Sequence, residues 1–200
     1  MPIRAVFFDF GGVIMRTEFQ SPRQHLAERF GMDYDDIDKV VFGSDSARSA
    51  SVGEITEDVH WAQVLKRLKR PISEAKFFQD EFFGGDVIDH GLVEFIRSLH
   101  GKVHTGLISN AWSGLREFIT REKMIDIFDT VVISAEVGTV KPSTRIYEVA
   151  LEQAKVSASE AVFIDDVSEN IEACKRVGMK GVLFKDPQES LDRLKRLLKI

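Results

Sequence analysis

The sequence is poor in cysteine and in basic residues. One cysteine, Cys174, among 200 residues excludes an internal disulfide and is typical of a protein from a reducing compartment. Lysines and arginines number 27 against 32 aspartates and glutamates, which gives a net charge of −5. Because no basic stripe is available to replace the counterions of a phosphate backbone, a nucleic-acid partner is not expected.

Long apolar runs are also missing. No stretch of about 18 apolar residues could cross a membrane, and no basic and apolar leader is recognised. We therefore expect a soluble, cytoplasmic protein without a membrane partner, present as a monomer or homodimer. A length of 200 residues suits one domain with an insertion, or two small domains.

A short apolar run near the start organises the rest of the chain. Ala5 to Phe8 predicts a strand buried on both faces, and Asp9 follows it directly. A carboxylate at the carboxyl end of such a strand lies where open α/β sheets bind their ligands. Gly11 and Gly12 let the backbone turn sharply and come close to whatever binds there. The alternative is that Asp9 only caps a turn.

Residues 16–86 show helical periodicity and no convincing buried strand. A helix fits Asp36 to Phe42, and three other residues stand where a helix N-cap is expected: Ser21, Thr56 and Ser73. An all-helical block between the first strand and the later strands predicts a small α-helical cap inserted into the core. We expect hinges near residues 15–18 and 84–87.

From residue 87 onward, strands and helices alternate. The expected strands are Val103 to Ile108, Thr130 to Ile133, Ala161 to Ile164 and Gly181 to Phe184. The helix that follows Val103 to Ile108 is expected to carry four apolar residues on one side: Trp112, Leu115, Phe118 and Ile119. Such alternation predicts an α/β fold with a doubly wound, Rossmann-like parallel sheet, formed by residues 1–15 and 87–200.

Polar residues follow three of these later elements. Ser109 and Asn110 end one strand, Asp165 and Asp166 end another, and Lys141 stands just before a helix. Because the carboxyl ends of parallel strands meet at one edge of a sheet, these groups are expected to converge with Asp9.

The convergent residues suit phosphoryl transfer. Three carboxylates repel one another unless a cation lies among them, and hard oxygen ligands select Mg²⁺. A carboxylate nucleophile forms a covalent aspartyl-phosphate, which divides hydrolysis into two easier steps. Ser109 can donate hydrogen bonds to the transferring oxygens, while Lys141 supplies a fixed positive charge.

Four motifs in this order, DFGGV at Asp9, LISN at Ser109, VKP at Lys141 and FIDD at Asp165, resemble the haloacid dehalogenase-like hydrolase superfamily. The resemblance covers essentially the whole chain. The helical insert resembles the small cap of the subgroup that contains glucose-1-phosphatase-like enzymes and the N-terminal domain of soluble epoxide hydrolases.

The resemblance implies a role for each motif residue. Asp9 would be the nucleophile and a metal ligand, and Lys141 would stabilise the transition state. The implied metal-site residues are Asp9, the carbonyl of Gly11, Asp166, and Asp165 acting through water. The implied substrate-binding residues are Ser109, Asn110, Gly12 and Lys141. The joint at residues 53–56 is expected to face the active-site cleft.

The expected function is therefore a Mg²⁺-dependent phosphatase for a small phosphomonoester, such as a sugar phosphate. Most phosphatases of the superfamily carry a second aspartate, as acid and base, where this chain has Gly11. Losing a general acid costs about 10²- to 10⁴-fold in rate. Two alternatives stay open: a 2-haloacid dehalogenase, disfavoured by the paired Asp165 and Asp166, and a phosphate-binding regulator without turnover.

Overall fold

The computed structural model describes residues 2–200 and contains a five-stranded parallel sheet of order β5–β4–β1–β6–β7. Its strands are β1 (Ala5–Phe8), β4 (His104–Ser109), β5 (Thr130–Ile133), β6 (Ala161–Asp165) and β7 (Lys180–Leu183). All five are the strands expected from sequence, with ends that agree to within a residue. The first strand lies in the middle of the sheet, where both of its edges are paired.

Two apolar layers bury the sheet. Helices α6 (His90–Leu99), α7 (Leu115–Arg121) and α11 (Pro187–Leu198) cover one face, and α9 (Thr144–Ala154) and α10 (Ser168–Val177) cover the other. In β1, Val6 and Phe8 face the first layer while Ala5 and Phe7 face the second. This arrangement confirms the doubly wound α/β fold. Within residues 2–200, no helix combines the length and the apolarity needed to cross a bilayer.

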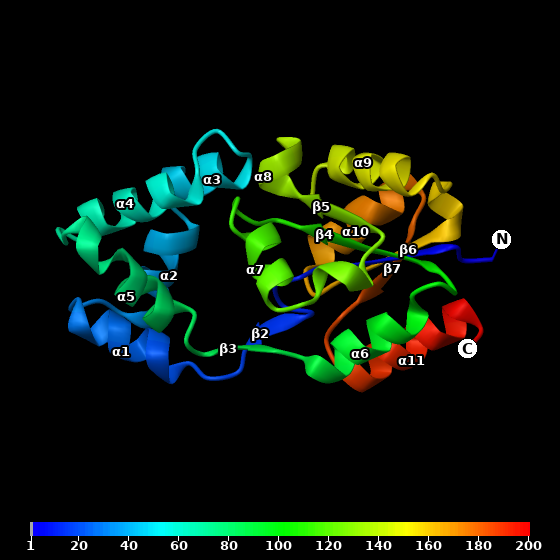
Figure 1. Ribbon diagram of the computed structural model, residues 1–200, viewed down its shortest axis with the longest axis horizontal. Coiled ribbons are helices and arrows are strands. Elements are labelled where there is room, and N and C mark those ends of the chain that lie inside the picture. Colours follow the sequence, from blue (N-terminus) through cyan, green and yellow to red (C-terminus); the bar gives the residue numbers. More distant parts are fainter. Residues whose placement is uncertain (1) are drawn as a thin grey trace.

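The helices of residues 21–82, which we call the helical block, gather at one end of the molecule (Figure 1). They are α1 (Ser21–Arg29), α2 (Tyr34–Phe42), α3 (Asp45–Ser51), α4 (Glu57–Arg67), a 3₁₀ helix (Ile72–Glu74) and α5 (Ala75–Phe82). They share an apolar core, whose largest fully buried members are Trp61, Phe78 and Phe82. The block therefore packs as a unit that is separate from the two layers of the sheet.

Two of the three expected N-caps are wrong. Gln20 already has helical backbone angles and is the N-cap of α1, so Ser21 lies inside the first turn. Ser73 lies within the 3₁₀ helix rather than before α5. Thr56 is confirmed, because its side chain accepts a hydrogen bond from the backbone N–H of Val59. Local sequence patterns place a helix more reliably than its first residue.

The connections between the block and the core form a two-stranded antiparallel ribbon, β2 (Met15–Thr17) with β3 (Asp86–Ile88). Arg23 of α1 is buried and fastens this ribbon to the block: its guanidinium contacts Asp86 at 3.2 Å and Asp38 at 2.9 Å. The expected hinge segments thus overlap two paired strands. Each strand has only three residues, which is too short for a periodic pattern to reveal it.

Candidate active site

Three carboxylates meet at the carboxyl edge of the sheet. Asp9 follows β1, Asp165 ends β6 beside it, and Asp166 is the next residue. Oxygen atoms from these three side chains all lie within 4.8 Å of one another. Asp9 and Asp165 are buried, with 6% and 0% of their surfaces exposed, whereas Asp166 is exposed. The strand register therefore brings together residues that lie more than 150 positions apart in the sequence.

Lys141 joins two of these carboxylates. Its Nζ lies 2.6 Å from Oδ1 of Asp9 and 2.7 Å from Oδ2 of Asp165, and its side chain is almost completely buried. Desolvation makes a buried charge costly unless it is paired, and each member of this trio supplies a partner. Lys141 therefore links the two buried carboxylates, and it orients Asp9 from one side.

Asp165 is engaged on all sides by protein donors. Apart from Lys141, it accepts hydrogen bonds from the backbone N–H of Val167 at 2.8 Å and from the amide of Asn170, at 3.1 Å on each oxygen. A carboxylate offers about four lone-pair positions, so these bonds occupy the acceptor capacity of Asp165. The carboxylates with room for a cation are consequently those of Asp9 and Asp166.

The electrostatics of the site favour a positive ligand. Burial raises the pKa of Asp9 to about 7, with Asp165 adding to the rise and Lys141 opposing it. The pKa of Asp166 is also raised, by burial first and by the charge of Asp165 second. Both shifts express the cost of holding several negative charges in a space with little water, and a cation between them removes that cost.

The two glycines after Asp9 differ in what surrounds them. Gly12 has a φ of +79°, and a Cβ built there would stand 2.3 Å from Oδ2 of Asp166. Only glycine permits this approach of the turn to the carboxylate. At Gly11, by contrast, φ is not left-handed and a Cβ would meet no heavy atom within 4 Å. The lack of a side chain at Gly11 is therefore not imposed by packing.

The structure places Ser109 and Asn110 at the end of β4, the strand next to β1. Ser109 is buried, and Leu107, two residues before it, pairs with Phe8 in the register of the sheet. Asn110 accepts the backbone N–H of Lys141 at 2.7 Å through its Oδ1, and its amide donates to the Lys141 carbonyl at 2.9 Å. Asn110 thereby fixes the backbone from which Lys141 reaches the carboxylates.

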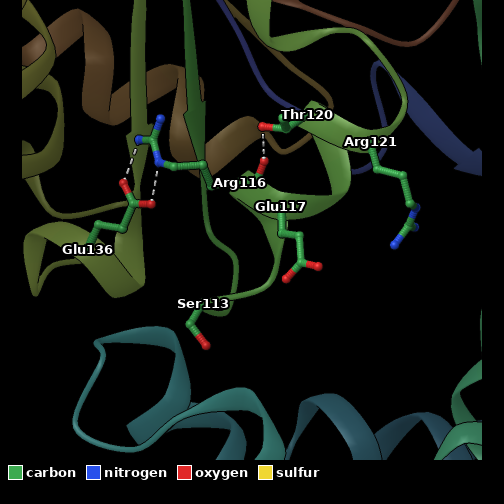
Figure 2. A pocket seen from close by; sticks show the side chains of 6 residues that line it. All are labelled: Ser113, Arg116, Glu117, Thr120, Arg121 and Glu136. Atoms are coloured by element: carbon green, nitrogen blue, oxygen red, sulfur yellow. Dashed lines mark hydrogen bonds and ion pairs between the residues drawn. The ribbon is translucent and has the colours of Figure 1, made fainter.

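A cleft of about 460 Å³ opens beside Asn110, between the helical block and the core. Its lining comes from the block and from two core residues: Phe42, Arg48, Ser49, Ser51, Val52, Glu54, Asn110 and Val140. Glu54, in the joint expected to face the cleft, accepts a hydrogen bond from Ser49 at 2.8 Å. A second hollow, of about 560 Å³, lies on α7 (Figure 2), and none of the three carboxylates lines either of these two hollows.

Sequence reasoning missed two residues that shape the site. Asn170 holds Asp165, and the Tyr147 hydroxyl donates a hydrogen bond to the carbonyl of Asn170 at 2.9 Å. The spacing of Asn170, one helical turn after Asp166, was the available signal, since it aims the amide back at the end of β6.

The expectation for Trp112 was wrong. It precedes α7 and packs in the core of the helical block rather than on an α7 face.

A doubly wound parallel sheet whose carboxyl edge carries three carboxylates and a buried lysine defines a Rossmann-like enzyme with an acidic active-site edge. The chain belongs to the haloacid dehalogenase-like hydrolases, a family that matches residues 6–184. It is therefore a hydrolase of that family.

Curated relatives cover nearly the whole chain. Rat bifunctional epoxide hydrolase 2 is 24% identical over 217 residues, which include 98% of this chain and 39% of that protein. Sesquiterpene phosphatase astK of Aspergillus oryzae is 26% identical over 200 residues, 98% of this chain and 96% of that protein. The D-ribitol-5-phosphate phosphatase of Bacteroides thetaiotaomicron is 24% identical, with 89% and 90% covered.

Solved structures share the fold. A HAD-like family hydrolase from Porphyromonas gingivalis has a TM-score of 0.81 at 20% identity, with both chains covered completely. A HAD family enzyme of Bacteroides thetaiotaomicron, in complex with magnesium and inorganic phosphate, has a TM-score of 0.79 at 19% identity, with 92% and 94% covered.

Proposed function

We propose that this protein is a Mg²⁺-dependent phosphatase that hydrolyses a small phosphomonoester through an aspartyl-phosphate. The observation that carries the proposal is the placement of Asp9 at the end of the central strand, 2.6 Å from Lys141 and beside Asp165 and Asp166. Two relatives that match it over nearly their whole length bear the name phosphatase.

The acidic cluster fits a Mg²⁺ ion. Asp9, Asp166 and the carbonyl of Gly11 would hold it. The sequence resemblance assigns Asp165 a role through water, but its acceptor positions are taken by protein donors, so it would support the site by holding Lys141. When bound, Mg²⁺ neutralises phosphate and carboxylate charge together, so that one anion can attack another. The gap that Gly12 leaves beside Asp166 keeps that carboxylate in place for the ion.

The chain's own residues supply the remaining steps. Asp9 forms a bond to phosphorus as the bond to the leaving oxygen breaks, and water then hydrolyses the acyl phosphate to release phosphate and restore Asp9. Lys141 favours the ionised form of Asp9 and balances charge on the transferring group. Ser109 and Asn110, at the end of the adjacent strand, bind the phosphate oxygens.

The substrate class follows from the cleft. We treat residues 16–86 as a cap domain over a core of residues 1–15 and 87–200, so the 460 Å³ cleft between them receives the leaving group. Arg48, Ser49 and Glu54 supply a cation, a hydroxyl and a carboxylate, a set that hydrogen-bonds a polyol or sugar. Because Gly11 offers no acid, turnover of such substrates is slow, and those whose leaving group needs the least protonation are favoured.

The test is phosphate release from a panel of sugar phosphates, polyol phosphates and nucleotides with Mg²⁺ present. Asp9→Asn keeps the size of the side chain and removes the nucleophile, so release is expected to fall to background. Addition of EDTA is expected to abolish release as well. Equal activity of wild type and Asp9→Asn would exclude Asp9 as the nucleophile, and chloride release from a 2-haloacid in EDTA would indicate a dehalogenase instead.

A further inference from the structure

One residue from the α/β part of the chain belongs to the apolar core of the helical block. Trp112, in the loop 110–114 between β4 and α7, is only 9% exposed. Its ring centroid lies 4.3 Å from that of His60 and 5.4 Å from that of Trp61, which it meets edge to face. Edge-to-face pairs at this distance add to the apolar burial. The loop is thereby anchored in the block as well as in its own domain, where Ala111 exchanges two hydrogen bonds with Oγ of Ser134.

Glu57, in the first turn of α4, fastens the same loop. Its Oε2 accepts the backbone N–H of Gly114 at 3.0 Å, and its own backbone N–H donates to Oγ of Ser113 at 3.2 Å. Its Oε1 accepts Nε1–H of Trp61 at 3.1 Å. Figure 2 shows Ser113 at the end of the α7 hollow with its hydroxyl directed toward the helices of the block.

Gly114 lies directly against the carboxylate of Glu57. A Cβ at Gly114 would stand 2.3 Å from Oε2 of Glu57, the nearest heavy atom to it. The backbone of Gly114 is right-handed, with a φ of −78°, so an alanine there would suffer no conformational strain. A Cβ at Gly114 would therefore displace the carboxylate of Glu57, which is the end of a flexible side chain, and so break this contact.

The loop begins at Asn110, which connects this contact to the site. Asn110 exchanges two hydrogen bonds with the backbone of Lys141, and Lys141 reaches Asp9. A path of direct contacts thus runs from Glu57 through the loop to the nucleophile. Arg23 fastens the block to the antiparallel ribbon as well.

We propose that Glu57 is a positioning residue, which holds loop 110–114 against the helical block and so keeps Asn110 and Lys141 aligned with Asp9. This inference rests on the proposed function, because alignment matters only if Asp9 attacks a bound phosphate. Docking of the block and assembly of the site are then one event, since the loop that carries Asn110 is seated in the block.

A double-mutant cycle tests the proposal. Glu57→Ala and Gly114→Ala break the same contact from opposite sides, so each is expected to lower kcat for phosphate release by about ten- to a hundredfold. The double variant should be no slower than either single variant, because the contact can be lost only once. Glu57→Gln, which keeps one acceptor oxygen, should restore part of kcat, and exposed Asp58→Ala should match wild type. Losses that multiply in the double variant would overturn the proposal.

Tryptophan emission gives a second readout that needs no turnover. The chain has two tryptophans, and both belong to this contact. Glu57→Ala and Gly114→Ala are expected to shift emission to the red, with unchanged far-UV circular dichroism. Because coupling is reciprocal, Asn110→Ala should shift it too, while Asp58→Ala should not.

Phosphate release and tryptophan emission together distinguish a failure of the proposed phosphatase function from a failure of the positioning role. If the wild type releases no phosphate from any substrate, the proposed function fails, and the emission of Asn110→Ala alone decides whether the site and the helical block are coupled. Emission that stays at the wild-type value in Asn110→Ala would show that the contact is confined to the block, and would overturn the positioning role.

Discussion

The position two residues after Asp9 is where a new catalytic group can be installed. Gly11→Asp places a carboxyl group beside the leaving oxygen, where it can donate a proton as the bond to phosphorus breaks. The structure accepts the change: a Cβ at Gly11 meets no heavy atom within 4 Å, its φ is not left-handed, and the residue is exposed. The cost to folding is therefore small.

The size of the gain follows from general acid catalysis. A well-placed acid contributes about 10²- to 10⁴-fold, which corresponds to about 3 to 5 kcal/mol of the barrier. The gain should be largest for alkyl and sugar phosphates, whose leaving alkoxides need a proton. It should be small for p-nitrophenyl phosphate, whose leaving group is stable as an anion.

The assay compares kcat/KM for both kinds of substrate in wild type, Gly11→Asp and Gly11→Asn. The asparagine variant has the same size and no acidic proton, so it should stay near wild type. Equal rates for the aspartate and asparagine variants on an alkyl phosphate would refute the reasoning, because the acid would then have no role at that position.

Two further outcomes follow from buried groups. Burial lowers the pKa of His60 from 6.5 to about 4, so its neutral form stabilises the fold above pH 6.5 and that contribution, about 3 kcal/mol, is lost as the pH falls through 4. Between pH 7 and 4, the free energy of unfolding, measured with denaturant, should therefore fall less in His60→Gln than in wild type. An equal fall in the two proteins would contradict this. Gly12→Ala should weaken Mg²⁺ binding in calorimetric titration by displacing Asp166, whereas Gly31→Ala, also at positive φ but in open space, should not. Equal Mg²⁺ affinity of these two variants would exclude the clash as the cause.

The sheet was predictable because its strands are short, mostly buried and mostly apolar. Ala5 to Phe8 and Ala161 to Ile164 have no polar residue, and in both strands a carboxylate follows at once. This change from apolar to acidic places a residue at the edge of a parallel sheet without knowledge of the strand order. The meeting of Asp9, Asp165 and Asp166 could be predicted for the same reason.

Contacts between the helical block and the core could not be predicted. Trp112 has the spacing of an α7 residue, and a periodic pattern reports that a side chain is buried without reporting which neighbour buries it. Glu57 is one of two acidic residues in the first turn of α4, where a favourable interaction with the helix dipole explains both equally well. Its partners come from a loop more than 50 residues later in the chain.

The antiparallel ribbon has a consequence for how such a molecule can be altered. Thr17 and Asp86 are cross-strand partners, so the chain departs from the sheet and returns to it at neighbouring points. Everything between them occupies the position of a hairpin loop, and closing a longer loop adds little entropic cost. Exchange of the whole segment for a different one would leave the strand ends in place, but the new segment would also have to seat loop 110–114, because that loop packs against the segment that is replaced.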